Sequence, residues 1–302
     1  MHAVGIDVGG TNVRAAVVDK NGQVLDLIKE PTPAFAPDVL PVLVNLINHY
    51  LKHEKYDISA AGIGLSGVID PITGVITGAG DTMPGWLGTE VGKYLKEKLP
   101  IPVTIDNDVN VAGLGEFINR KLIGDPVHQF VYLSIGTGLG GAIIHNGRII
   151  SGNNGGAGEI GHSILYPDGL ACGCGKMGCA EKYVSGTALN RFAKEISSDC
   201  HSYELLKLYQ SRDAKAVRLI RQFLRDLGTV MINIQAYFDP EEIIIGGGLS
   251  SAFYLMKADL NRILSSLGHQ QEVNWSIAAD GENIGVIGAA YLSETADHSQ
   301  MR

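Results

Sequence analysis

The sequence predicts an α/β fold with mixed parallel and antiparallel sheets. Short apolar segments typical of buried strands alternate along the chain with segments in which apolar residues recur at helical spacing. Asn-Gly pairs at 21–22 and 146–147 separate apolar runs, which is a strong signal for β-hairpins. The order strand, glycine turn, strand, hairpin, strand opens the chain and returns at residues 130–150, which indicates an internal repeat.

The individual elements follow from these patterns in chain order. In the first half we expect a strand over 2–10, two hairpin strands within 13–32, a helix over 38–51, a strand over 60–67, a helix over 89–99, a strand over 102–108 and a helix over 109–120. In the second half we expect the repeat at 130–150, an irregular glycine-rich stretch over 151–181, a long helix over 214–237, a strand with a triple-glycine turn and a helix N-cap over 241–250, and a closing helix over 283–295.

Length and composition limit the classes of protein. The 302 residues suffice for two ordinary domains or one large one, and a chain that is 45% hydrophobic and 19% charged is globular. The net charge of −8 disfavours nonspecific contact with nucleic acid or an anionic membrane. No run of about 18 apolar residues is present, and the opening reaches glycine and aspartate too early for a secretory signal. We therefore expect a cytoplasmic protein without a nucleic-acid or membrane partner.

Glycine clusters follow three of the expected strands, at 7–12, 134–141 and 245–250. Such turns expose successive backbone N–H groups and bind anions, although tight hairpins and bulges use glycine as well. Three of them together favour a nucleotide. The spacing at 136–141 does not fit the dinucleotide fingerprint, a hairpin follows it where that fingerprint has a helix, and the chain has no Walker-type loop.

Polar residues gather where the strand over 102–108 ends. Asp106, Asn107, Asp108 and Asn110 precede a helix. Phosphoryl transfer to a hydroxyl needs a base beside that hydroxyl, and Asp108 is suited to this role, while Asn107 can both donate to and accept from a sugar hydroxyl. A helix N-cap made by Asp108 or Asn110 explains the cluster equally well from the residues alone.

Three cysteines, Cys172, Cys174 and Cys179, lie within eight positions. A structural zinc site has four nitrogen or sulfur ligands, and the fourth could come from His162 upstream or from Cys200 downstream. A redox role is weaker because the motif is C-x-C and not C-x-x-C, and three thiols cannot pair without leaving one over. The pattern favours structural zinc.

The glycine turns resemble the phosphate-1, phosphate-2 and adenosine loops of the superfamily of actin, heat-shock chaperones and sugar kinases. The matching residues are Asp7, Gly9, Gly10, Thr11 and Asn12 in the first turn, Gly136, Thr137 and Gly138 in the second, and Gly246, Gly247 and Gly248 in the third. The resemblance implies the actin-like ATPase (ribonuclease-H-like) fold, with two domains of duplicated βββαβαβα units and ATP in the cleft between them. It also implies that Asp7 helps to hold the Mg²⁺ of ATP. We expect a smaller domain of residues 1–115 plus 286–302 and a larger one of residues 116–285.

The segment "GEIGH" at 158–162, followed by "CGCGKMGCAE" at 172–181, is similar to the signature of the ROK family (repressors, ORFs and kinases), specifically its zinc-containing sugar kinases. This resemblance covers nearly the whole chain. It implies a structural zinc held by His162, Cys172, Cys174 and Cys179. It also implies sugar contacts from Asn107, Asp108, Glu159, His162 and Glu181, with Asp108 as the catalytic base, and places Ser66, Gly67 and Gly80 near the hexose.

The expected activity is therefore that of a glucokinase-like, ATP-dependent hexose kinase acting on the 6-hydroxyl, with glucose as the first substrate to consider. Thr82 stands where many glucose-specific members have asparagine, so N-acetylmannosamine, N-acetylglucosamine, mannose and fructose remain open.

Two rival readings come from other classes of protein. The repressor branch of the same family carries a helix-turn-helix ahead of the first strand, where this sequence has only Met1 and His2, and we therefore do not expect a regulator. A sugar sensor without catalysis is disfavoured by an intact Asp108 and three glycine turns. Homodimers are common in the family, which makes a homodimer an expectation from the resemblance alone.

Overall fold

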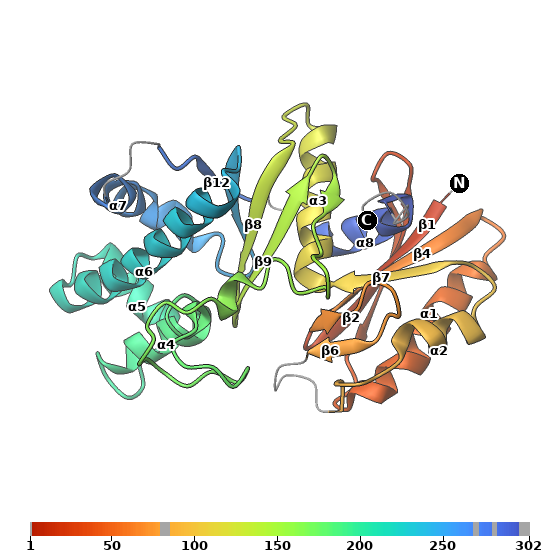
Figure 1. The fold of residues 1–302 in the computed structure, drawn as a ribbon, viewed down its shortest axis with the longest axis horizontal. Coiled ribbons are helices and arrows are strands. Elements are labelled where there is room, and N and C mark those ends of the chain that lie inside the picture. The colour runs from red at the N-terminus through yellow and green to blue at the C-terminus, as the bar shows by residue number, and fades with distance from the viewer. Residues whose placement is uncertain (1, 79–84, 268–271, 280–282, 296–302) are drawn as a thin grey trace. The chain divides into compact units, whose positions relative to one another are not determined.

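The computed structural model describes residues 2–78, 85–267, 272–279 and 283–295 (Figure 1). The chain forms two compact units. Unit 1 comprises residues 1–128, 142–158 and 279–302, and unit 2 comprises residues 129–141 and 159–278. No helix within the described ranges is long and apolar enough to cross a membrane.

A five-stranded sheet forms the centre of unit 1. It contains β1 (His2–Val8), β2 (Asn12–Asp19), β3 (Val24–Pro31), β4 (Ile58–Leu65) and β7 (Val103–Asn107), in the order β3-β2-β1-β4-β7. The first three strands are antiparallel, whereas β4 runs parallel to β1 and β7 runs parallel to β4. Gly22 adopts a φ of +75° in the predicted hairpin turn, where the Asp19 carboxylate accepts from the backbone N–H groups of Asn21 and Gln23.

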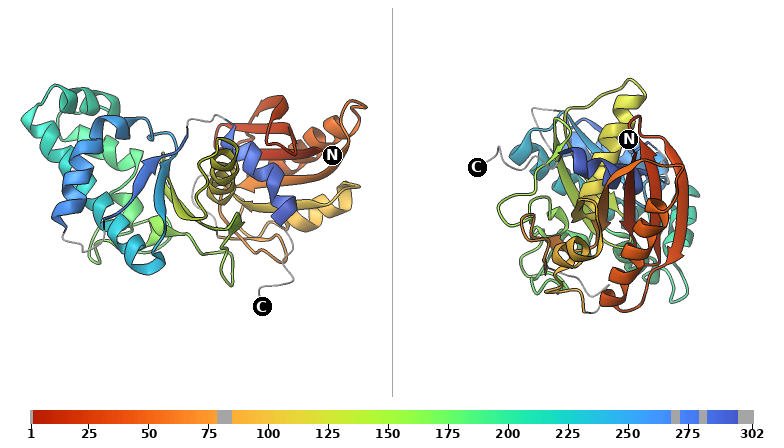
Figure 2. Two further views of the ribbon diagram at one scale, coloured as in Figure 1. Left: turned by 90° about the horizontal axis from the view of Figure 1, so that it is seen from above. Right: turned by 90° about the vertical axis from the view of Figure 1, so that its right-hand side faces the viewer.

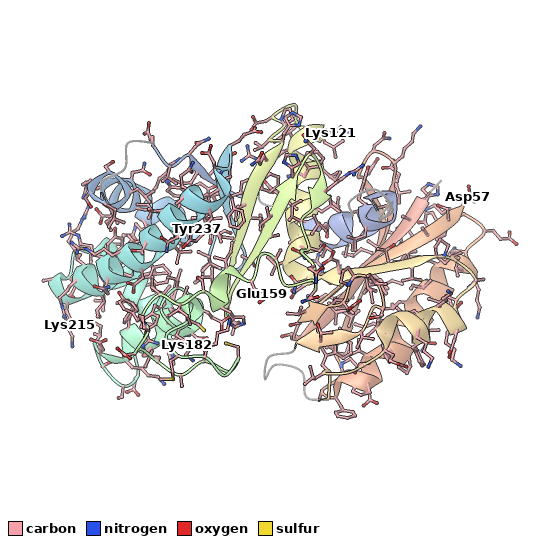
Figure 3. The ribbon with its side chains drawn as sticks, viewed as in Figure 1. Asp57, Lys121, Glu159, Lys182, Lys215 and Tyr237 are labelled. Atoms are coloured by element: carbon pink, nitrogen blue, oxygen red, sulfur yellow. The ribbon has the colours of Figure 1, made fainter. Side chains whose placement is uncertain are left out.

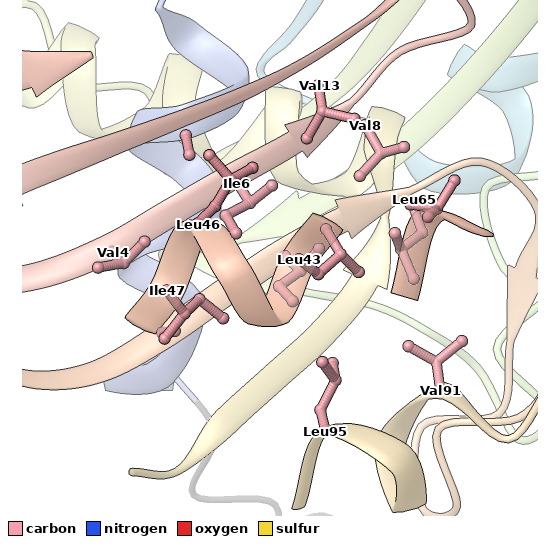
Figure 4. Close-up of a cluster of buried hydrophobic side chains, with 14 of the residues drawn as sticks. Val4, Ile6, Val8, Val13, Leu43, Leu46, Ile47, Leu65, Val91 and Leu95 are labelled. Atoms are coloured by element: carbon pink, nitrogen blue, oxygen red, sulfur yellow. The ribbon is translucent and has the colours of Figure 1, made fainter. Parts of the chain in front are cut away.

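Helices cover both faces of this sheet. On one face, α1 (Val39–Leu51) and α2 (Val91–Lys98) bury apolar residues such as Leu43, Ile47 and Leu95 against Ile6 and its neighbours (Figure 4). On the other face lie α3 (Asp108–Leu122) and α8 (Ile284–Thr295). Successive residues of a strand point to opposite faces, so β1 contributes to both layers.

Two glycines let α8 approach the sheet closely. A Cβ at Gly5 would overlap the carbonyl oxygen of Val286, and a Cβ at Gly62 would overlap that of Ala289. Figure 2 shows α8, in blue, beside α3 and the red strands of the sheet. Helix α8, near the C-terminus, thus packs on the sheet that contains the N-terminal strand β1.

The second sheet repeats the strand order of the first. It contains β8 (Gln129–Ile135), β9 (Leu139–His145), β10 (Arg148–Ile149), β11 (Glu242–Gly246) and β12 (Trp275–Ile277), in the order β10-β9-β8-β11-β12. The parallel strands β8, β11 and β12 correspond to β1, β4 and β7. The predicted α/β class and the predicted internal repeat are both confirmed.

The remaining elements are mostly helical. They are α4 (Gly186–Lys194), α5 (Ser202–Gln210), α6 (Ala214–Phe238) and α7 (Ala252–Ser266), the short strands β5 (Val68–Ile69) and β6 (Ile76–Gly78), and single 3₁₀ turns at Ala36–Asp38, Ile160–His162 and Ala180–Lys182. The long helix expected over 214–237 is confirmed as α6. The sequence patterns did not predict α4 and α5.

Candidate active site and metal cluster

The ends of the parallel strands in unit 1 bring acidic residues to one edge of the sheet. Asp7 on β1 pairs with Gly64 on β4, and Gly64 pairs with Asp106 on β7. Asp7 and Asp106 therefore lie at the same edge, one strand apart. In open α/β sheets this edge, at the carboxyl ends of the strands, is where ligands bind.

Asn107 caps the helix that follows β7. Its side-chain oxygen accepts from the backbone N–H groups of Val109 at 2.8 Å and Asn110 at 3.2 Å, and its amide nitrogen donates to the carbonyl oxygen of Gly67 at 3.0 Å. The N-cap is thus Asn107, and not Asp108 or Asn110 as the capping alternative supposed. Asp108 occupies the first helical position.

Two side chains fix the backbone at 66–67. Trp86, which is 1% exposed, donates from Nε1 to the carbonyl oxygen of Ser66 at 2.7 Å, while Asn107 binds the next carbonyl group. Gly67 has a φ of +111°, and a Cβ there would lie 2.6 Å from the carbonyl oxygen of Gly78. The expected sugar-side residue Gly80, and Thr82 at the departure from the glucose-type segment, lie outside the described residues.

The first glycine turn joins β1 to β2 after Val8, the residue that follows Asp7. Gly9 donates its N–H to the carbonyl oxygen of Asn12 at 3.0 Å, and its own carbonyl oxygen accepts from the Thr32 hydroxyl at 2.6 Å. Burial raises the pKa of Asp7, and the positive charge of Arg14 opposes this shift in part. A buried carboxylate of this kind is a group that a bound cation would stabilise.

The other two glycine turns lie side by side in unit 2. The turn 136–138 connects β8 to β9, and the turn 246–248 follows β11, which pairs with β8. Gly247 has a φ of +82°, and a Cβ there would lie 2.7 Å from the backbone nitrogen of Ile135. Leu249 donates its N–H to the carbonyl oxygen of Ile135 at 2.9 Å. The two turns therefore form one continuous backbone surface.

The sulfur atoms of Cys172, Cys174 and Cys179 converge with His162. One ligand atom from each of the four residues lies within 4.8 Å of the others. The Sγ atoms of Cys174 and Cys179 are 3.5 Å apart, and Cys172 Sγ is 3.7 Å from His162 Nδ1. Ligands about 2.3 Å from a tetrahedral zinc ion are separated by about 3.8 Å, so this spacing fits such an ion. Cys200, whose position is also described, is not part of the group.

The thiols of this cluster would repel one another if they ionised without a cation. The pKa of Cys179 is raised to about 12, first by burial, then by hydrogen bonds to Cys174 and Cys172 and by their charges. Since thiolates are the form that binds metal, a divalent cation would remove the repulsion between them. The donor set is that of a metal site.

His162 lies between the cysteines and Glu159. Its Nδ1 faces Cys172, and its Nε2 lies 3.8 Å from Oε2 of Glu159, the residue labelled in Figure 3. Burial raises the pKa of Glu159; the nearby His162 lowers it, and the charge of Glu181 raises it further. Glu181, two residues after the last cysteine, accepts from the backbone N–H of Leu139 at 3.2 Å. Glu159, His162 and Glu181 thus lie beside the three cysteines.

A hydrogen-bonded network that the sequence analysis missed supports the cysteine loop. Tyr166 donates to Asp226 on α6 at 2.6 Å, and Gln222 donates to the same carboxylate at 3.0 Å. The rings of Tyr166 and Tyr183 are 4.6 Å apart, and the Tyr183 hydroxyl accepts from the N–H of Leu170 at 2.7 Å. The signal available in the sequence was a single aspartate among the apolar, core-facing positions of the long helix.

The expected site residues fall into two sets, one in each unit. Unit 1 holds Asp7, Gly9, Gly10, Thr11, Asn12, Ser66, Gly67, Asn107 and Asp108, and unit 2 holds Gly136, Thr137, Gly138, Glu159, His162, Cys172, Cys174, Cys179, Glu181, Gly246, Gly247 and Gly248. Within each set, residues far apart in the sequence are brought together, as the bond from Asn107 to Gly67 and the bond from Leu139 to Glu181 illustrate.

Comparison with known proteins places this geometry in a family. The ROK family matches residues 3–296. A glucokinase from Halalkalibacterium halodurans is 31% identical, and the match covers 98% of this chain and 96% of the glucokinase. An N-acetyl-D-glucosamine kinase from Photobacterium profundum is also 31% identical, and the match covers 96% of this chain and 98% of that kinase. The crystal structure of a ROK family glucokinase from Streptomyces griseus in complex with glucose and AMPPNP superimposes with a TM-score of 0.80 at 29% identity, covering 97% of this chain and 99% of that one. The two-sheet α/β architecture is that of the ROK sugar kinases, which have the actin-like ATPase fold. The chain belongs to the ROK family.

Proposed function

We propose that the protein is an ATP-dependent hexose kinase that phosphorylates the 6-hydroxyl of glucose. The observation that carries this proposal is the position of Asp108. It is the first residue of a helix, at the carboxyl edge of the sheet, next to an asparagine that binds the 66–67 backbone. This is the place where a base for a bound hydroxyl is needed, in a chain whose relatives include glucokinases.

In the proposed reaction, the Asp108 carboxylate accepts the proton of the 6-hydroxyl while the hydroxyl oxygen attacks the γ-phosphorus of ATP, and the bond from that phosphorus to the β,γ-bridging oxygen breaks to release ADP. Most of the catalysis in such a step comes from positioning and charge stabilisation. We assign the sugar to Asn107, Glu159, His162 and Glu181, with the 66–67 backbone nearby. We assign ATP to the three glycine turns, whose N–H groups suit phosphate.

Two metal ions belong to this proposal. Zinc, held by His162 and the three cysteines, would crosslink the loop that carries Glu159 and Glu181, and the spacing of the four donors fits it. Asp7 would hold the Mg²⁺ that accompanies ATP and neutralises phosphate charge, which suits a buried carboxylate with a raised pKa. The proton transfer and the sugar contacts are assigned to protein side chains alone.

A kinase of an N-acetylated hexose is the second candidate. N-acetyl-D-glucosamine and N-acetylmannosamine kinases are among the relatives, at 31% and 27% identity. Mannose and fructose remain further alternatives. A homodimer and the division of the chain at residues 115 and 286 are expectations that rest on the family resemblance. Cytoplasmic location is an expectation that rests on the sequence patterns alone.

The test is a coupled ADP-release assay with glucose, mannose, fructose and the two N-acetylated sugars. We expect turnover with glucose, and Asp108→Asn should lower kcat by about 10²- to 10⁴-fold, the usual contribution of a general base. Asp57→Asn, at the exposed aspartate labelled in Figure 3, serves as the matched control and should leave kcat unchanged. Near-normal kcat in Asp108→Asn would refute the catalytic assignment, and turnover of an N-acetylated sugar alone would replace glucose as the substrate.

A further inference from the structure

Glu181 lies against the turn that we assign to phosphate. One of its carboxylate oxygens, Oε2, accepts from the backbone N–H of Leu139 at 3.2 Å. Leu139 is the first residue of β9 and follows the turn 136–138 directly. A carboxylate that binds a sugar hydroxyl can use one oxygen for the hydroxyl and the other for a backbone N–H. Glu181 is therefore placed to touch the sugar and the phosphate turn at the same time.

Gly138 leaves the space that this contact needs. A Cβ at Gly138 would overlap Oε2 of Glu181 and lie 3.2 Å from its Cδ, and the three nearest atoms to such a Cβ all belong to Glu181. The φ of Gly138 is not in the left-handed region, so alanine is compatible with the backbone there. A substitution at this position would act on the glutamate and not on the turn itself.

The segment that follows Glu181 makes two further hydrogen bonds to the same turn. Gly186 donates its N–H to the carbonyl oxygen of Gly136 at 2.7 Å, and Thr187 donates its hydroxyl to the carbonyl oxygen of Thr137 at 2.8 Å. At the other end of the cysteine loop, a Cβ at Gly161 would overlap the carbonyl oxygen of Leu139. A shift of the turn 136–138 should therefore also displace Glu181.

We propose that Glu181 couples the sugar to the phosphate-binding turn, and that Gly138, although it belongs to that turn, is a positioning residue for the sugar. The proposal rests on the proposed kinase function.

The experiment compares Gly138→Ala with Gly156→Ala, the same change at a glycine outside the residues that we assign to sugar or ATP. No described atom lies within 4 Å of a Cβ at Gly156, and its φ is not in the left-handed region. The sugar Kd is measured by calorimetry without nucleotide, using the best substrate of the assay panel. We expect Gly138→Ala to raise the sugar Kd about tenfold or more, the size expected for one charge-assisted hydrogen bond, and Gly156→Ala to leave it within about twofold.

A double-mutant cycle with Glu181→Ala separates this coupling from general damage to the loop. In the Glu181→Ala background, Gly138→Ala should raise the sugar Kd no further, because the group it displaces is gone. An equal Kd in wild type and Gly138→Ala, or independent effects of the two changes, would overturn the coupling while leaving the kinase proposal intact. A wild-type protein that binds and phosphorylates none of the sugars would overturn both. Metal content and thermal unfolding check that each variant is folded.

Discussion

Asn107 combines two contacts that are usually made by separate residues. Its oxygen caps α3, and its amide nitrogen holds the carbonyl group of Gly67 on the neighbouring strand end. The cap fixes where the helix begins and therefore where Asp108 lies. The second contact fixes the backbone that we place near the sugar. The same side chain thus sets the distance between the proposed base and the sugar-side backbone.

Serine at position 107 should separate these contacts, because a serine side chain can cap a helix but is too short to reach Gly67. We expect Asn107→Ala to lower the free energy of unfolding by about 0.5–2 kcal/mol, and Asn107→Ser to lower it by only a few tenths. Both variants should raise the KM for the sugar. Chemical denaturation and steady-state kinetics measure the two effects. A wild-type KM in Asn107→Ser would show that the bond to Gly67 does not serve sugar binding.

The loop between β10 and α4 is held from two directions. His162 and the three cysteines gather its two halves at one point, and Tyr166 binds Asp226 on α6. The loop has little regular structure of its own, and these contacts add to the backbone hydrogen bonds within it, such as the bond from the N–H of Leu165 to the carbonyl oxygen of Gly178 at 2.8 Å. Glu159 lies three residues before His162, and Glu181 lies two residues after Cys179. The contacts that order the loop therefore also fix the positions of these two glutamates.

Removing one cysteine should release the part of the loop that depends on metal. Cys174 is the exposed cysteine of the cluster, so Cys174→Ala leaves no buried cavity and tests the ligand role alone. We expect the zinc content per chain, measured by elemental analysis, to fall well below that of the wild type, and the KM for the sugar to rise as Glu159 and Glu181 lose their support. Cys200→Ala, at a buried cysteine outside the cluster, should retain zinc. Full zinc retention in Cys174→Ala would contradict the proposed ligand set.

The sequence predicted those elements whose patterns lie within their own residues. The Asn21-Gly22 hairpin, α1 and α6 are specified by turn chemistry and apolar spacing within their own residues. The helices α4 and α5, with nine residues each, were not predicted; helices of this length depend on packing, and α4 and α5 pack against each other and against α6.

The site divides in the same way. The glycine turns and the cysteine spacing can be recognised in the sequence, because the residues of each motif lie within a few positions of one another. The bond from Leu139 to Glu181 spans 42 residues, and the bond from Tyr166 to Asp226 spans 60. Contacts at such separations depend on how the elements pack, and packing is not encoded in any single stretch.

The repeated sheet gives the glycine turns equivalent places in the fold. The first and second turns connect β1 to β2 and β8 to β9, the same step in each repeat. Gly67 and Gly247, which both have positive φ, follow the equivalent parallel strands β4 and β11. Equivalent turns of the two sheets therefore have different proposed roles. We assign the turn after β4 to sugar binding and the turn after β11 to nucleotide binding.

The C-terminal helix α8 closes unit 1, and the stability of that unit should depend on how closely it can approach the sheet. A Cβ at Gly62 would overlap the carbonyl oxygen of Ala289 and lie 3.2 Å from Cβ of Leu292, so alanine must push α8 outward. We expect Gly62→Ala to lower the free energy of unfolding of unit 1 by about 1–3 kcal/mol, the usual result of overpacking. Gly156→Ala is the control from the same unit, because no described atom lies within 4 Å of its Cβ.

Fluorescence can assign this loss to unit 1, because the chain has two tryptophans and each unit contains one of them. In a Trp275→Phe background, the buried Trp86 is the sole indole, and its emission during denaturant unfolding follows unit 1 alone. Gly62→Ala should move the Trp86 transition to lower denaturant, while Gly156→Ala should change the free energy by less than about 0.5 kcal/mol, as expected for a surface site. In the reciprocal Trp86→Phe background, Trp275 should report a smaller shift, because unit 2 does not contain α8. If Gly62→Ala left the Trp86 transition in place, the close approach of α8 would not be what stabilises the first sheet.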